Sequence, residues 1–187
     1  MSSSPDRAFI GTFTGKKFFL LKPRLKDIDI RDIAHALANQ CRWTGHAKWH
    51  YSVAQHAYYC SFLGPDSEAF DRLNHDDSEA YMGDMSRPLK HFTSAGVAYR
   101  RQEAVIQHLI CKKYGLSLIE PPSVHIADQQ MLYAERDQLM RLNFREADNK
   151  RISSETRAPI KIARWTPEKA EKMFLKRFYQ LYKEKSK

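Results

Sequence analysis

Apolar residues recur at helical spacing along most of the chain, and this pattern predicts helices rather than strands. Over residues 29–40 they mark one face of a helix: Ile30, Ile33, Ala34 and Leu37. Similar stripes or helix-start signals predict further helices over residues 52–63, 67–82, 97–114, 121–144 and from 166 onward. Around Gly15, β-favouring residues allow a short strand or an extended arm over residues 12–21. The expected fold class is therefore all-α.

Residues that favour helix ends support these boundaries. Ser52 and Ser67 are good N-caps, and Thr166-Pro167 is a typical helix start. Gly115 suits the left-handed position that closes a helix. The segments between these signals are expected to be loops, at residues 41–51 and 83–96.

The chain is expected to form one compact domain over residues 1–187. Residues 1–14 are expected to be a flexible N-terminus, and residues 166–187 a C-terminal helix. The polar segment 148–161 is the best linker candidate.

Composition places the chain among globular proteins. Its 187 residues are 42% hydrophobic and 12% aromatic, enough to bury a core and to exclude global disorder. The apolar run at residues 18–21 is far shorter than the about 20 residues of a membrane helix, and the polar start does not resemble a secretory signal. Three cysteines without a Cys-x-x-Cys spacing favour free thiols. We therefore expect a soluble, cytoplasmic protein.

Positive charge is concentrated at the C-terminal end. The net charge is +9, and residues 161–187 hold nine Lys or Arg against three acidic residues. Such an excess can bind nucleic acid or phosphate, but it is also common on the solvated face of a surface helix. The charge alone leaves both interpretations open.

One constellation of residues carries chemistry that divalent metals favour. Glu79 follows His75 at i+4 and Asp76 at i+3, so on one helix all three would project to one side. Imidazole and carboxylate ligands suit Zn²⁺, Co²⁺ or Mn²⁺, while a third carboxylate can stay free to act on an attacking water. His56 lies on the preceding predicted helix, and Asp128 at an inward-facing position where a cation would stabilise it. The pattern fits a four-ligand metal site, with buried salt bridges as the alternative.

The order and spacing of these residues resemble a known family. His56, His75-Asp76 and Asp128 match the H…HD…D signature of HD-domain metal-dependent phosphohydrolases. Further motifs resemble the subgroup that contains bacterial 5′-deoxynucleotidases and phage dATP triphosphohydrolases of the DatZ type: Asp29-Ile30-x-x-Ile33-Ala34-His35, Arg42-Trp43, Ser78-Glu79-Ala80-Tyr81, Gly83-Asp84-Met85 and Arg87-Pro88-Leu89-Lys90. The resemblance spans about residues 14–141 and implies an HD-domain helical bundle.

The resemblance implies a metal centre with a catalytic carboxylate beside it. His56, His75, Asp76 and Asp128 would bind the metal. Glu79 would orient or deprotonate the attacking water, and Asp84 would act beside it on the sugar or on the departing group. Asp77 stands where the family more often has a small residue; it would either recruit an additional Mg²⁺ or point to solvent.

The resemblance also implies substrate contacts. Arg42 and Lys90 would bind phosphate, since their charge offsets the charge on the transferred phosphoryl oxygens. Trp43 and Pro88 would hold the base between two flat faces. Two alternatives stay open, namely Trp43 as a core aromatic and Lys90 as a solvated surface amine.

The expected function is metal-dependent hydrolysis of phosphate from a deoxynucleotide. By resemblance the favoured substrate is dATP, cleaved to deoxyadenosine by a phage enzyme in the host cytoplasm. The alternatives are a 5′-deoxynucleotidase acting on monophosphates, a nucleic-acid-binding protein with an inactive HD fold, and a signalling phosphodiesterase. A triphosphate would need more cations than Arg42 and Lys90, supplied by Lys48, Arg87 or His46. The family resemblance further implies self-association as a dimer or hexamer, without membrane or nucleic-acid partners.

Overall fold

The structure is a computed structural model that describes residues 8–143 and 156–185, and it is mostly helical. Its longer helices are α1 (Ile30–Asn39), α2 (Val53–Cys60), α6 (Ser94–Tyr114), α7 (Pro122–Leu139) and α9 (Pro167–Lys185). Three short helices lie between α2 and α6: α3 (Ala69–Leu73), α4 (Glu79–Met82) and α5 (Arg87–Phe92). The predicted all-α class is confirmed, with a minor hairpin added by β1 (Phe9–Gly11) and β2 (Lys17–Phe19).

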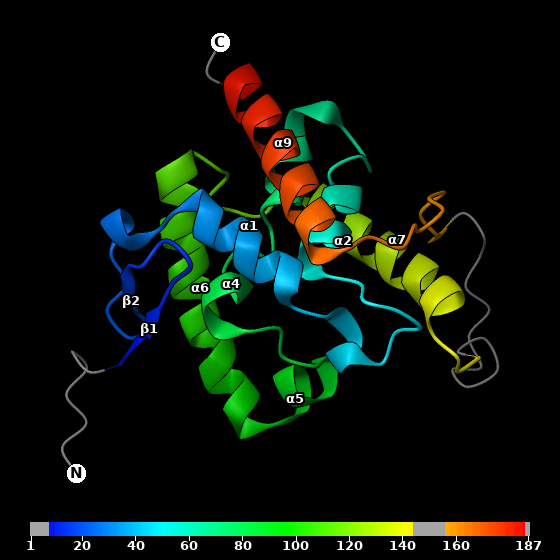
Figure 1. The fold of residues 1–187 in the computed structure, drawn as a ribbon, viewed down its shortest axis with the longest axis horizontal. Coiled ribbons are helices and arrows are strands. Elements are labelled where there is room, and N and C mark those ends of the chain that lie inside the picture. The colour runs from blue at the N-terminus through cyan, green and yellow to red at the C-terminus, as the bar shows by residue number, and fades with distance from the viewer. Residues whose placement is uncertain (1–7, 144–155, 186–187) are drawn as a thin grey trace.

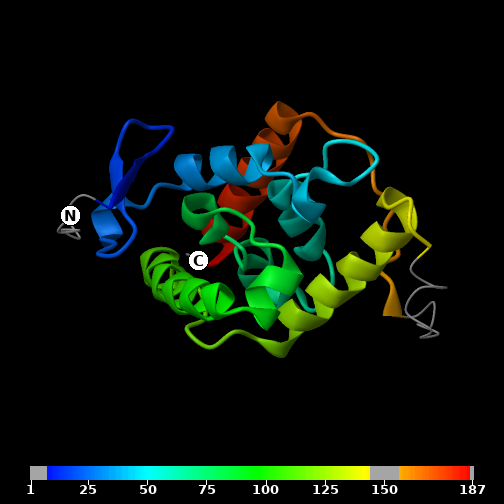
Figure 2. The ribbon, with the colours of Figure 1, turned by 90° about the horizontal axis from the view of Figure 1, so that it is seen from below.

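Helix α9 closes the bundle by packing across α1, α2 and α3 (Figure 1). Four residues of its predicted apolar stripe are buried: Ala170, Phe174, Phe178 and Leu181. Basic residues on the opposite side, such as Lys172 and Lys176, are exposed. Seen from below, α1 and α9 lie along one side of the molecule and α6 and α7 along the other, with the short helices between them (Figure 2).

The predicted N-caps Ser52 and Thr166 are present, and Asp29 adds one that was not predicted. The predicted cap at Ser67 is wrong, because Ser67 lies in the short turn Asp66–Glu68 and α3 begins after Glu68 without a side-chain cap. The Asp29 carboxylate accepts the backbone N–H of Arg31 at the start of α1, and Ser52 Oγ accepts that of Gln55 at 3.2 Å. Thr166 Oγ1 accepts the backbone N–H of Lys169 at 3.3 Å, next to α9. Gly115 ends α6 with φ of 69°. Local sequence therefore determines where these helices begin and end.

The expected flexible N-terminus is in part ordered. Residues 1–7 lie outside the described chain, but β1 pairs antiparallel with β2 around Gly15, whose φ is 81°. Thr14 then donates twice to the Asp32 carboxylate of α1, through its backbone N–H at 2.6 Å and its hydroxyl at 2.9 Å. This pair of bonds ties the hairpin to the bundle.

The predicted single helix over residues 67–82 is wrong. Helix α3 ends at Leu73, α4 begins at Glu79, and His75 to Ser78 form a turn between them. Gln107 on α6 holds this turn at both ends: its amide donates to the carbonyl of Asn74 at 2.7 Å and accepts the N–H of Ser78 at 3.0 Å. Backbone groups that would continue a helix are thus bonded to a side chain instead.

The predicted loop over residues 83–96 is wrong in part, because it contains α5 and the start of α6. Pro88 stands in the first turn of α5, a position at which proline is tolerated. Thr93 caps α6 by accepting the N–H of Gly96 at 3.1 Å. A Cβ at Gly96 would lie 2.3 Å from the carbonyl oxygen of Leu89, so only glycine allows α5 to pack this closely on α6.

Arg72 explains why the chain is polar just before His75. Its side chain is fully buried and donates to the carbonyls of Cys60 at 3.1 Å and Pro65 at 2.7 Å, and to Ser123 Oγ at 3.0 Å. The guanidinium therefore cross-links α2, the loop after it and the start of α7.

The predicted linker over residues 148–161 falls partly outside the described residues. Its described part runs along α7 and is bonded to it, through Ala158 N–H to the Gln130 carbonyl at 3.0 Å and Gln138 Nε2 to the Ile160 carbonyl at 2.9 Å. Within residues 8–143 and 156–185, the helices are too short or too polar to cross a bilayer.

Candidate metal centre

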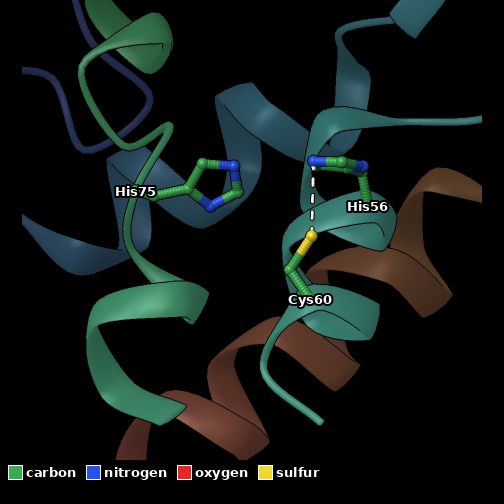
Figure 3. A group of neighbouring side chains, drawn as sticks. All are labelled: His56, Cys60 and His75. Atoms are coloured by element: carbon green, nitrogen blue, oxygen red, sulfur yellow. Dashed lines mark hydrogen bonds between the residues drawn. The ribbon is translucent and has the colours of Figure 1, made fainter. Parts of the chain in front are cut away.

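A buried group of His56, Cys60 and His75 could hold a metal ion (Figure 3). His56 and Cys60 stand one turn apart on α2, and His75 faces them from the turn that follows α3. Each of the three offers one ligand atom, and these atoms lie within 4.8 Å of one another. Cys60 Sγ lies 3.4 Å from His56 Nε2.

Two carboxylates extend this group. Asp76 Oδ2 lies 3.2 Å from His75 Nε2 and 3.9 Å from His56 Nε2, and Asp128 Oδ1 on α7 lies 3.2 Å from His56 Nε2. Two ligands bonded to one ion at about 2.1 Å are about 3.0 to 4.2 Å apart, depending on the angle between them. The structure therefore places His56 near Asp76 and Asp128, and His75 near Asp76, at separations that two ligands of one divalent ion can have.

The imidazole of His75 is oriented so that its Nε2 can bind a metal ion. Its Nδ1 donates to the Arg72 carbonyl at 2.8 Å, which places the proton on that nitrogen because a carbonyl only accepts. Its Nε2 is buried and has no hydrogen-bond partner among the described residues. Nε2 faces Asp76 Oδ2 at 3.2 Å, and it would present its lone pair to a metal ion that displaces the proton from this nitrogen.

His56 is oriented in the same way by a carboxylate. Its Nδ1 lies 2.6 Å from Glu135 Oε1, so Nε2 is left facing Asp128 and Cys60. Glu135 is itself fully buried on α7. The arrangement is the carboxylate–histidine pair that commonly supports a metal ligand.

Burial and close charges act together on the titrating groups. Burial disfavours the charged form of His75, but the Asp76 carboxylate outweighs it and raises the pKa of His75 to about 10. Burial likewise opposes ionisation of Asp128, but His56 and Arg42 lower its pKa to about 2. The carboxylates therefore stay ionised and attract positive charge, whether from protons or from a metal.

Glu79 and Asp84, the two predicted catalytic carboxylates, lie close enough to Asp76 for their charges to interact with its charge. Glu79 is 4% exposed, and its Oε2 is buried without a hydrogen-bond partner in the described part of the chain. Burial, together with the charges of Asp76 and Asp84, raises the pKa of Glu79 well above its usual value. Gln40 braces the pair, since its amide donates to the Glu79 carbonyl at 3.0 Å and accepts the Asp84 N–H at 3.1 Å.

Lys90 reaches this carboxylate cluster from α5. Its Nζ lies 2.7 Å from Glu103 Oε1 and 3.9 Å from Glu79 Oε1. Lys90 is half-buried, so it is not simply a solvated surface amine. The Lys90 ammonium is therefore close enough to Glu79 for both side chains to contact the same bound group.

Arg42 lies beside the ligands and points its charge at carboxylates. Its guanidinium is 3.2 Å from Glu135 Oε2, 3.6 Å from Asp76 Oδ2 and 4.0 Å from Asp128 Oδ1. The contact with phosphate implied by the resemblance stays a prediction, since these carboxylates already neutralise much of the Arg42 charge.

Trp43 is half-buried and directs its indole N–H to Glu135 Oε2 at 3.0 Å. Its backbone and that of Thr44 are left-handed, with φ of 58° and 52°, a conformation that non-glycine residues adopt at a cost of about 1–3 kcal/mol. Pro88 is exposed at the start of α5. The holding of a base between Trp43 and Pro88 stays a prediction.

Asp77 does not point to solvent, which was one of the two expectations for it. Its side chain is fully buried and burial raises its pKa well above the usual value. Neither carboxylate oxygen has a hydrogen-bond partner among the residues that the structure describes.

Several residues of the site were not assigned a role from the sequence: Gln40, Tyr51, Cys60, Gln107 and Glu135. Two of them left a signal in their spacing. Cys60 follows His56 by one helical turn, and Glu135 follows Asp128 by two. Gln107 left none, because it acts on a turn far from it in sequence.

The fold and the site define a compact helical protein with a buried centre of histidine, cysteine and carboxylate side chains. Over 132 residues the chain is 46% identical to the uncharacterized protein YfdR of Escherichia coli K12, covering 71% of this chain and 72% of YfdR. The chain belongs to the family of YfdR. It is also 29% identical over 161 residues to the uncharacterized protein RCAP_rcc00048 of Rhodobacter capsulatus, covering 76% and 78% of the two chains. No protein-family model matches the chain.

Proposed function

We propose that the protein is a metal-dependent phosphohydrolase that acts on deoxynucleotides. The observation that supports this most is the convergence of His56, His75, Asp76 and Asp128, whose facing donor atoms are 3.2 to 3.9 Å apart. The resemblance to HD-domain phosphohydrolases rests on these same residues. Zn²⁺, Co²⁺ and Mn²⁺ all suit such a mixed set of imidazole and carboxylate ligands.

A divalent ion bound by these residues would supply Lewis-acid activation of the attacking water and of the phosphoryl group. The residues around it would do the rest. Glu79 keeps a buried oxygen, Oε2, that no described group engages, so Oε2 is available to accept the proton of the water. Asp84 lies beside it, and Lys90 adds fixed positive charge on the same side.

The supply of cations favours a substrate with few phosphates. Arg42 and Lys90 are already close to carboxylates, and Lys48, one of the residues considered for a third contact, donates to the carbonyl of Gln138 at 2.9 Å. Arg87 and His46 are exposed. The cations near the site therefore support hydrolysis of deoxynucleoside monophosphates best. The resemblance, in contrast, favours the triphosphate dATP as the substrate.

The experiment that tests the function is a metal and substrate survey. Protein stripped of metal is reloaded with Zn²⁺, Co²⁺, Mn²⁺ or Mg²⁺ and incubated with dNMPs, dNTPs and rNTPs, and the products are identified by chromatography. Release of phosphate or triphosphate from a deoxynucleotide, dependent on metal, supports the proposal. Absence of hydrolysis with every metal, in protein that binds the ion, would contradict it.

A further inference from the structure

Glu135 is the meeting point of four hydrogen-bond donors in the interior of the protein. His56 Nδ1 at 2.6 Å and the Tyr51 hydroxyl at 3.0 Å donate to Oε1. Arg42 Nε at 3.2 Å and Trp43 Nε1 at 3.0 Å donate to Oε2. The carboxylate is fully buried, and a buried carboxylate is stable only when it is bonded in this way.

The two oxygens serve two different parts of the site. Oε1 orients His56, which faces Asp128 through its other nitrogen at 3.2 Å. Oε2 engages Arg42 and Trp43, the two residues that the resemblance assigns to the substrate. One rigid side chain on α7 thus connects a metal ligand to the loop that would contact the nucleotide.

The backbone of this loop needs such an anchor. Trp43 and Thr44 are both left-handed, and strained conformations of this kind persist only where the surroundings impose them. The loop is closed by the Arg42 N–H, which donates to the Tyr51 carbonyl at 2.9 Å. Tyr51 also donates to Glu135, so the carboxylate is bonded to both sides of the closed loop.

We infer that Glu135 is a positioning residue that fixes the metal ligand His56 and the substrate loop of Arg42 and Trp43 in one geometry. This role rests on the proposed function, because it assigns Glu135 to the same site. Partners of metal-binding histidines typically change metal affinity by about 10- to 100-fold when they are replaced.

The test replaces Glu135 by glutamine, which keeps the size of the side chain and removes its charge. Zinc affinity is measured by competition with a chromophoric chelator. Steady-state kinetics of deoxynucleotide hydrolysis by the zinc-loaded protein give KM and kcat. We expect Glu135→Gln to bind zinc about 10- to 100-fold more weakly and to raise KM as well. Trp43→Phe, which loses only the loop contact, should raise KM and leave zinc affinity unchanged. In the double variant the two KM effects should fall short of their product, because both remove the same contact.

A spectroscopic signature separates positioning from general stability. In zinc-loaded protein, NMR of the histidine ring nitrogens should show the His56 Nδ1 proton strongly deshielded by its bond to Glu135, and Glu135→Gln should lose this signal. The matched control is Glu171→Gln, since Glu171 Oε2 lies 3.0 Å from His35 Nδ1 and forms a histidine–carboxylate pair between α9 and α1 that is not part of the candidate site. That variant should leave zinc affinity, KM and the His56 signal unchanged.

The outcomes distinguish this role from the function on which it rests. Unchanged zinc affinity and KM in Glu135→Gln, beside a wild type that binds zinc and hydrolyses nucleotide, overturn the role of Glu135 alone. A wild type that binds none of Zn²⁺, Co²⁺ and Mn²⁺ overturns the metal site and the proposed function with it. If Glu135→Gln loses its helical circular dichroism, Glu135→Asp takes its place with the same expected changes, because a shorter carboxylate cannot reach both pairs of donors.

Discussion

Glu135 and Glu79 are both buried glutamates at the candidate site, but they differ in their hydrogen bonding and in the direction in which their pKa is shifted. Glu135 accepts four hydrogen bonds, and although burial opposes its ionisation, Arg42 and His56 lower its pKa. Glu79 keeps a buried oxygen without a partner among the described residues, and burial with two neighbouring carboxylates raises its pKa.

The difference teaches how one site can hold both rigid and reactive carboxylates. A carboxylate whose lone pairs are engaged has little capacity to take up a proton, so it fixes geometry. A carboxylate that is desolvated and under-bonded is stabilised by a proton or a cation, which is what a general base needs. We therefore expect Glu135 to fix the geometry of the site and Glu79 to take part in proton transfer.

The largest effect is expected from replacing the predicted metal ligand Asp76. Asp76→Asn should lose metal binding and lower hydrolysis by about a thousandfold or more, since a first ligand and its charge are removed. Metal content by mass spectrometry and initial rates check this. Asp77→Asn is the matched control one residue away, and it should bind metal and turn over like the wild type, because burial raises the pKa of Asp77 and so favours its uncharged form.

Glu79→Gln should lower kcat by about 10²- to 10⁴-fold, the range typical of a lost general base. Its metal content should stay near that of the wild type, in contrast to Glu135→Gln. Rates and metal content measured on the same preparation show whether Glu79 acts in catalysis or in metal binding. A Glu79→Gln protein without metal would show that the two glutamates do not differ in role.

Trp43→Ala should raise KM by about 10- to 100-fold, at about 1–3 kcal/mol for the loss of stacking on a base. Trp165→Ala is the control, because Trp165 is buried against Tyr58 and Tyr59 and is not among the predicted substrate contacts. It should cost about 3–5 kcal/mol of unfolding free energy and leave KM unchanged. A large loss of Tm in Trp43→Ala with unchanged KM would make Trp43 a core residue instead.

The smallest effect concerns the cap of α1, far from both glutamates. Hydrogen bonds from Arg31 and Lys16 lower the pKa of Asp29, so its ionised form stabilises the fold above about pH 4, the unfolded value, and that contribution is lost as the pH falls through the folded pKa. Asp29→Ala should cost about 1 kcal/mol at pH 7.

Denaturant unfolding at pH 7 and pH 3 measures the pH dependence of the Asp29 contribution. Asp29→Asn, which keeps a good capping side chain and removes the charge, is the control. It should lose less stability at pH 7, and its difference from the wild type should shrink at pH 3. A difference that grows as the pH falls would contradict the sign of this contribution.

The sequence predicted the parts of the molecule that local chemistry determines. Helix starts at Ser52 and Thr166 and the end at Gly115 follow from single residues and their neighbours. The four predicted ligands come from a motif whose order and spacing are visible without the structure. The structure places them near one another, and their binding of a metal stays a prediction.

The rest depends on contacts between distant segments. The helix break after Leu73 is held by Gln107, whose side chain comes from another helix. Arg42 was expected to be available to phosphate, but its closest partner is Glu135, 93 residues later in the chain. Neither contact leaves a periodic pattern, so neither can be read from local sequence.

The central claim is that one divalent ion is held by two histidines and two aspartates, and anomalous diffraction from crystals grown with zinc tests it most directly. The account predicts one strong peak at about 2.0–2.2 Å from His56 Nε2, His75 Nε2 and an oxygen of each of Asp76 and Asp128. A peak bound by His56, Cys60 and His75 without either carboxylate, or no peak at this site, would contradict it.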